Sequence, residues 1–147
     1  CVEFAYNSRL DTIQAVVAKY FIEKKLSNVT SSRINNALRL DSLLEELPQI
    51  SLLKRDKDLK EVFHLYIFKA ENRDKLYDHL RKKGIDAKVH YPVPMHLQPA
   101  ANYLGYVEGD FPIAEAYAKN TISLPVHEFI TLGQIEKMAG IIKEFYL

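Results

Sequence analysis

The sequence holds a single cysteine, Cys1, among 147 residues, so it offers neither an internal disulfide nor a cysteine-based metal site. Its five glycines are scattered and form neither a phosphate loop nor a dinucleotide fingerprint. No apolar run reaches membrane-spanning length, and we expect no signal peptide at the start of the chain. Basic residues total 20 and acidic residues 19, and this balance argues against a dedicated nucleic-acid binder. We therefore expect a cytoplasmic protein without membrane or nucleic-acid partners.

The length fits one domain with a core of its own, residues 1–147. Because the chain begins with Cys1 rather than methionine, we expect it to be a piece of a longer protein, either engineered or proteolytic. Apolar spacing predicts a first helix that is capped near Ser8 and Asp11 and runs to about residue 26. Polar residues 27–32 should break it, and residues 30–32 should cap a second helix, which ends before Pro48.

The second half of the chain alternates between strand and helix patterns. Branched and aromatic residues at 62–68 predict a strand buried on both faces, and residues 85–90 predict a second strand beside it. Three helices are expected: residues 72–84, a helix starting at residues 110–112, and one capped by Thr131 and Gln134. A short strand is expected at 121–124. The fold class is therefore α+β, with long N-terminal helices followed by a small, mainly antiparallel sheet covered by helices.

The most distinctive segment is residues 90–99, HYPVPMHLQP, which follows the second predicted strand. Proline fixes φ and donates no N–H, so this segment can continue neither a central strand nor a regular helix. It should form a stiff loop at a strand end, a position typical of binding groups.

The five histidines do not predict a metal site, because they lack helical spacing and because residues 90–99 contain no carboxylate. His64 lies between apolar neighbours and is expected in the core, whereas His79 is expected on an exposed helix face. His127 follows a proline in a loop, where packing and function are equally plausible. No nucleophile elbow supports a serine hydrolase.

Residues 6–9, YNSR, precede the first helix, where backbone N–H groups and the helix dipole favour an anion. Asn7 and Ser8 add donors, and Arg9 could pair with a phosphate or a carboxylate. Local chemistry alone favours ordinary capping beside one surface arginine.

Four motifs together resemble one family. Residues 6–15, YNSRLDTIQA, resemble the opening of the C-terminal part of the DegT/DnrJ/StrS sugar aminotransferases, in which the pattern is roughly Tyr-Asn-x-Arg-Leu-x-x-Ile-Gln-Ala. HYPVPMHLQP at 90–99, GDFPIAE at 109–115 and SLP at 123–125 follow in the family's order. This resemblance covers essentially the whole chain.

The resemblance implies the small C-terminal domain of a fold-type-I transferase that uses pyridoxal 5′-phosphate (PLP) as an electron sink. Such enzymes transfer an amino group, usually from glutamate, to a nucleotide-linked keto-sugar, at a site between the two subunits of a homodimer. By resemblance, Asn7 would contact the cofactor phosphate of the partner subunit, with Arg9 nearby. His90, Tyr91 and His96 would bind the nucleotide sugar.

The family's catalytic lysine and N-terminal PLP-binding domain are absent from residues 1–147, so we expect no catalytic residue, no bound PLP and no transaminase activity in this chain alone. Its partners would be that missing domain, which would cover an exposed apolar face, and a homodimer partner. Relatives with histidine in place of the lysine are sugar dehydratases, and this alternative stays open. A stand-alone small-ligand binding or interaction module is the alternative outside the family.

Overall fold

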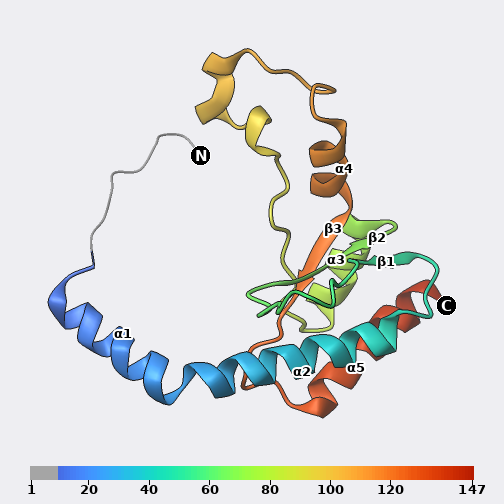
Figure 1. The fold of residues 1–147 in the computed structure, drawn as a ribbon. Helices are drawn as coiled ribbons and strands as arrows, with labels where there is room; N and C mark the ends of the chain where they lie inside the picture. The colour runs from blue at the N-terminus through green and yellow to red at the C-terminus, as the bar shows by residue number, and fades with distance from the viewer. Residues whose placement is uncertain (1–9) are drawn as a thin grey trace.

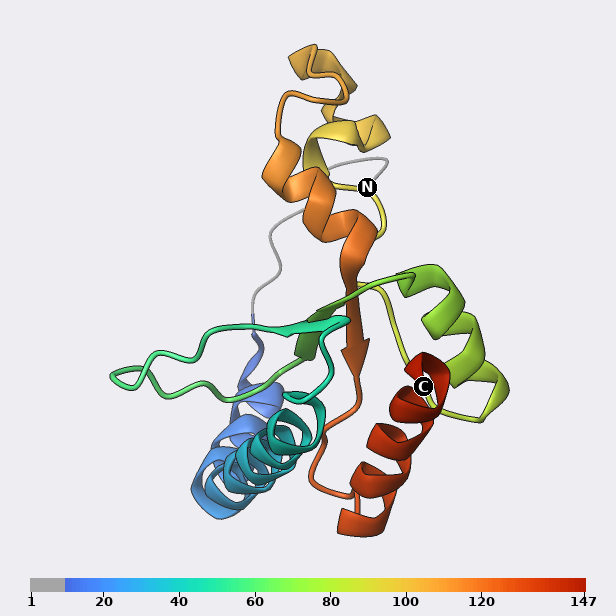
Figure 2. The same cartoon turned by 90° about the vertical axis from the view of Figure 1, so that its right-hand side faces the viewer.

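The structure is a computed structural model that describes residues 10–147. Its centre is a three-stranded antiparallel sheet in the order β1-β2-β3, which confirms the predicted α+β class. Helices α2, α3 and α5 pack around this sheet, whereas η1, η2 and α4 extend away from it (Figures 1 and 2). The elements are α1 (Thr12–Lys24), α2 (Leu26–Leu44), β1 (Ile50–Leu52), β2 (Tyr66–Ala70), α3 (Arg73–Lys82), η1 (Met95–Leu97), η2 (Pro99–Leu104), α4 (Pro112–Asn120), β3 (Thr121–Leu124) and α5 (Leu132–Tyr146).

The core fills the space between the sheet and helices α2, α3 and α5. Each fully buried leucine, isoleucine or phenylalanine side chain contributes about 1.5–3 kcal/mol of hydrophobic free energy. The largest fully buried side chains are Leu40, Leu44, Tyr66, Phe68, Leu76, Leu80, Ile122, Ile135 and Ile142. No helix within residues 10–147 is long and apolar enough to cross a membrane.

The boundary between the first two helices differs from the prediction. Asp11 caps α1 by accepting a 2.8 Å hydrogen bond from the Gln14 N–H, as expected, but α1 ends at Lys24. Residues 27–32 lie inside α2 instead of breaking the helix. Serine and threonine cost less than about 1 kcal/mol each in a helix. Packing of the apolar face of α2 outweighs that cost, since Leu40 and Leu44 are fully buried.

The strand predicted at residues 62–68 begins only at Tyr66. Phe63 has a φ of +49°, a left-handed conformation that cannot belong to a strand. Burial then alternates along β2 instead of being complete on both faces. The three-residue β1, which follows Pro48 closely, is too short to give a periodic signal and was not predicted.

Residues 85–90 form no regular strand, contrary to the prediction, and their neighbour is β3 rather than β2. One antiparallel bridge joins Lys88 to Ser123. The reason is topological, because β1 and β3 already occupy the two edges of β2. The outer edge of β3 is therefore the position left for this segment.

The helix termini match the sequence signals in part. Thr131 and Gln134 form the predicted capping box at the start of α5. Gly84 follows α3 with a φ of +80°, and the next N–H, of Ile85, returns to the Leu80 carbonyl at 2.9 Å. Asn72 occupies the N-cap of α3, but its side chain makes no capping hydrogen bond.

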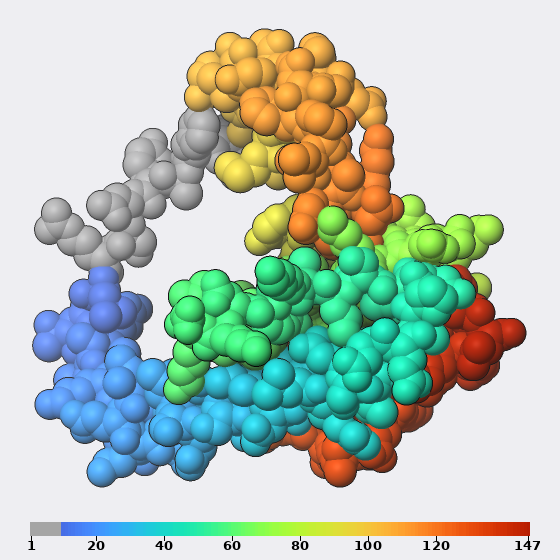
Figure 3. Space-filling view, turned by 45° about the vertical axis from the view of Figure 1, so that its right-hand side comes forward, coloured from blue at the N-terminus to red at the C-terminus, as the bar shows by residue number. Residues whose placement is uncertain are grey.

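Residues 91–120, which we call the arm, project from the body of the molecule (Figure 3). The arm comprises η1, η2 and α4, and it returns to the sheet at β3. Helix α1 projects at another corner and has no buried residue among its 13. The arm and α1 are therefore the parts that contribute least to the core.

Candidate functional site

A hollow of about 190 Å³ lies where β2 begins and β3 ends. Antiparallel pairing sets Tyr66, at the start of β2, opposite Leu124, at the end of β3. The segments before β2 and after β3 therefore emerge beside each other at this edge. The polar residues that line the hollow are Arg33, His64, Asp86, Lys88, His90, Ser123 and His127.

Two polar side chains of α2 hold the loops that form the walls. Arg33 Nη1 donates to the carbonyls of Phe63 and His64, at 3.2 and 3.4 Å. Asn36 Nδ2 donates to the His127 carbonyl at 3.1 Å and, more weakly, to that of Val126 at 3.4 Å. Helix α2 thus ties together two loops that lie about 60 residues apart in the sequence.

The third wall is the segment that precedes the arm. Lys88 and Ser123 exchange two backbone hydrogen bonds, of 3.0 and 2.8 Å. Asp86, Lys88 and His90 all line the hollow, as expected for alternate residues of an extended segment. Nδ1 of His90 lies 3.0 Å from Oγ of Ser123, which joins two motifs that are 33 residues apart.

The charges around the hollow are largely paired. Lys88 Nζ lies 3.0 Å from Asp86 Oδ1, and Arg81 also contacts this carboxylate. The hydrogen bond from Lys88, followed by the charges of Lys88 and Arg81, lowers the pKa of Asp86 in spite of the opposing effect of burial. Arg33 Nη2 lies 3.8 Å from a Glu128 carboxylate oxygen.

The three predicted substrate-binding residues occupy different surroundings. His90 is half-buried in the lining of the hollow. Tyr91 is 69% exposed, and its ring meets the His90 ring edge-on, with the centroids 5.7 Å apart. His96 lies in the arm, where its side chain is 8% exposed and packs against Phe111. The structure therefore places His90 and Tyr91 together and His96 apart from them.

Glu115 joins η1 to the start of α4 within the arm, a role that sequence reasoning missed. It accepts hydrogen bonds from the Gly109 N–H at 2.9 Å and the Phe111 N–H at 3.2 Å, and its Oε1 lies 3.0 Å from His96 Nε2. Burial opposes ionisation of Glu115, but these backbone donors and His96 together lower its pKa. The only sequence signal was its place in the GDFPIAE motif.

Two histidine predictions are wrong. His64 is exposed beside the hollow rather than buried in the core, because β2 starts two residues later. His79 is not solvated, since its Nε2 is buried with no hydrogen-bond partner among residues 10–147 and its ring packs on Phe145, with the ring centroids 5.5 Å apart. His127 is exposed at the hollow. Within residues 10–147, no three histidine, cysteine, aspartate or glutamate side chains are arranged to hold a metal ion.

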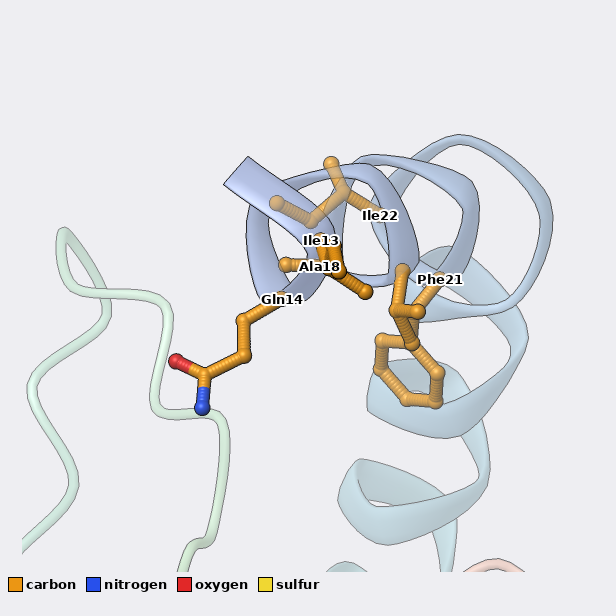
Figure 4. A pocket seen from close by; sticks show the side chains of 6 residues that line it. Ile13, Gln14, Ala18, Phe21 and Ile22 are labelled. Carbon is orange, nitrogen blue, oxygen red and sulfur yellow. The ribbon is translucent and has the colours of Figure 1, made fainter. Parts of the chain in front are cut away.

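Asn7 and Arg9, the predicted cofactor-phosphate contacts, lie outside the described residues. The helix that follows them, α1, carries a second hollow of about 470 Å³. Apolar side chains dominate it (Figure 4), including Ile13, Phe21 and Ile22. It presents an apolar surface and offers no group for acid, base or nucleophilic chemistry.

Comparison with known proteins gives a family match for nearly the whole chain. Residues 2–143 match the DegT/DnrJ/EryC1/StrS aminotransferase family. The chain is 38% identical over 143 residues to the pleiotropic regulatory protein of Geobacillus stearothermophilus. It is 36% identical over 139 residues to the dTDP-3-amino-3,4,6-trideoxy-alpha-D-glucose transaminase of Streptomyces venezuelae. These alignments cover 96% and 95% of the chain but only 38% and 36% of the relatives' lengths.

Solved structures give the same picture. The chain superposes on S. venezuelae DesV in complex with a ketimine intermediate with a TM-score of 0.89 and 36% identity, over 95% of this chain and 38% of that one. A DegT DnrJ EryC1 StrS aminotransferase from Brucella abortus follows with a TM-score of 0.83 and 30% identity, over 95% of this chain and 37% of that one. The chain thus spans little more than a third of each.

Proposed function

The chain belongs to the DegT/DnrJ/EryC1/StrS aminotransferase family, whose C-terminal part it matches, and we propose that it acts as the small domain of a PLP-dependent aminotransferase. The substrate would be a nucleotide-linked keto-sugar, with glutamate as the amino donor. The observation that carries this proposal is the family match over residues 2–143. In addition, two of the family motifs, residues 90–99 and 123–125, contact each other through His90 and Ser123 in one hollow.

In this proposal the hollow and the start of the arm form one wall of the substrate site. His90 and Tyr91 bind the nucleotide sugar, since they lie together at the hollow and Tyr91 is largely exposed. His96 contributes by holding the loop, because its buried ring lies against Glu115. Asn7 and Arg9, outside the described residues, would contact the cofactor phosphate of the partner subunit.

The described residues do not fit the whole cofactor, so no catalytic step is assigned to them. Ligand pockets commonly measure about 300–1,000 Å³, and this hollow measures about 190 Å³. Its one lysine, Lys88, is half-exposed and paired with Asp86, whereas a Schiff-base lysine needs a desolvated, unpaired amine. PLP would act as the electron sink from the rest of the aminotransferase, and this chain alone would be inactive.

Two exposed apolar surfaces support the proposal that further polypeptide binds this chain. On α1, Ile13 is 80% exposed and Val17 is 65% exposed. In the arm, Met95 is 83% exposed and Ile113 is 75% exposed. Apolar surfaces of this kind mark interaction sites. We propose that the remainder of the aminotransferase and a homodimer partner cover them.

The test uses the protein expressed from its complete gene. Its absorbance spectrum should show an internal aldimine, and it should aminate a keto-sugar nucleotide with glutamate. His90→Ala should raise KM for the nucleotide sugar, whereas His79→Gln, whose ring packs on Phe145 and does not line the hollow, should not. A folded, PLP-loaded dimer that fails to aminate any keto-sugar nucleotide would overturn the proposal. Deoxygenation of the sugar without amination would instead establish the dehydratase alternative.

A further inference from the structure

Strand β3 carries two buried hydroxyl groups with different partners. Ser123 is 3% exposed, and its Oγ lies 3.0 Å from His90 Nδ1. Thr121 is 4% exposed, and its Oγ1 donates to the Tyr117 carbonyl at 2.7 Å. Two hydroxyls of similar burial on one strand thus serve different elements, and only that of Ser123 reaches the hollow.

We propose that Ser123 is a positioning residue that fixes the orientation and the tautomer of the His90 imidazole. This inference rests on the proposed function, in which His90 contacts the nucleotide sugar. The bond made by one ring nitrogen of histidine decides which nitrogen carries the proton. Ser123 therefore determines how the other nitrogen, Nε2, meets the substrate.

The direction of the bond follows from the need to satisfy a buried donor. Within residues 10–147, His90 Nδ1 is the sole partner of the Ser123 hydroxyl. A buried hydroxyl without an acceptor costs about 1–3 kcal/mol, so it donates to Nδ1. Nδ1 is then the acceptor, and the proton of the neutral ring resides on Nε2. Nε2–H is a donor, which suits an oxygen acceptor of the ligand, such as a phosphate or carbonyl oxygen.

The backbone makes this arrangement rigid. Ser123 and Lys88 exchange hydrogen bonds of 3.0 and 2.8 Å, which fix the distance between the two segments. His90 follows Lys88 by two residues and so lies on the same side of the extended chain. The ring is therefore held at its base by the bridge and at Nδ1 by the hydroxyl.

The first experiment needs no activity and uses the 147-residue chain, which has only five histidines. Imidazole ¹⁵N NMR, with His90→Gln for assignment, should show the Nε2–H tautomer for His90. Ser123→Ala should give a mixture of tautomers, whereas Thr121→Val, which removes the other buried hydroxyl of β3, should leave His90 unchanged. Identical His90 spectra in the wild type and Ser123→Ala would overturn the inference. If the amide spectrum of Ser123→Ala shows that this variant does not fold, Ser123→Cys takes its place, because a thiol is a weaker donor than a hydroxyl. Identical His90 spectra in the wild type and Ser123→Cys would likewise overturn the inference.

The second experiment measures kinetics in the protein from the complete gene. Loss of one hydrogen bond that orients a binding group should raise KM for the nucleotide sugar roughly 2- to 10-fold in Ser123→Ala, with kcat nearly unchanged. Ser123→Thr should restore KM, and Thr121→Val should resemble the wild type. If Ser123→Ala alters the tautomer of His90 but leaves KM unchanged, the inference that Ser123 positions His90 for the substrate is refuted, although the tautomer assignment stands. An inactive wild type with the tautomer difference intact would instead overturn the proposed function.

Discussion

Replacing Tyr66 by phenylalanine tests how the loop before β2 is held. Tyr66 is fully buried, and its hydroxyl donates a 2.8 Å hydrogen bond to Asp41 Oδ1. Arg55 donates to both oxygens of the same carboxylate at 3.1 Å and also pairs with Glu61 at 2.8 Å. Residues 53–65, which end at the hollow, are therefore anchored on α2 through the Asp41 carboxylate as well as through Arg33.

The expected cost of this substitution follows from these contacts. A hydrogen bond to a charged group contributes about 1.5–3 kcal/mol. Asp41 keeps both bonds from Arg55 in Tyr66→Phe, and the buried ring is retained. The loss should therefore fall at the low end of that range, at about 1.5 kcal/mol. For a chain of this size, that corresponds to a decrease in Tm of roughly 3–6 °C.

The assay is equilibrium urea unfolding of the 147-residue chain, with the m-value checked for constancy. Tyr20→Phe is the matched control, because this tyrosine is 61% exposed on α1. Its free energy of unfolding should stay within about 0.5 kcal/mol of wild type. If Tyr66→Phe is as stable as the control, the assigned role of the Tyr66–Asp41 hydrogen bond is wrong.

Three further outcomes are expected. Burial, followed by the nearby Asp41, raises the pKa of Tyr66, and burial, followed by Glu71, raises the pKa of Tyr146 to about 12. The stabilisation from these two protonated tyrosines should therefore be complete below pH 10 and should be lost as the pH rises above 10. In urea unfolding at a series of pH values, Tyr146→Phe should reduce this loss. Glu115→Gln should lower the amide protection factors, the exchange rates relative to those of an unfolded chain, at residues 95–111. In the wild type the same loss of protection should appear as the pH falls from the ordinary value of 4.5 through the lowered pKa of Glu115, and no change in either case would refute its role in the arm. Thr131→Ala should cost about 1 kcal/mol in thermal unfolding, and an unchanged Tm would refute the capping box.

Sequence reasoning succeeded where the cause of a structure is local. The capping box of α5 depends only on Thr131 and Gln134, which are neighbours in the sequence. The end of α3 depends on Gly84 and its φ of +80°. These features were predicted because a few adjacent residues determine them.

Sequence reasoning failed where packing between residues far apart in the chain determines the structure. Residues 27–32 look like a break, yet the burial of Leu40 and Leu44 carries α2 through them. Residues 85–90 look like a partner for β2, yet both edges of β2 are occupied. The hollow could not be foreseen, because Arg33 and Asn36 assemble it by binding loops that are remote in sequence.

The single bridge between Lys88 and Ser123 also protects the molecule against aggregation. All four residues of β3 are buried, although β2 pairs with only one of its edges. A strand edge that is left unpaired is a template for pairing with another chain. The segment around Lys88 covers that edge and places a lysine beside it. Substitutions that detach residues 85–90 should therefore cause self-association before they cause unfolding.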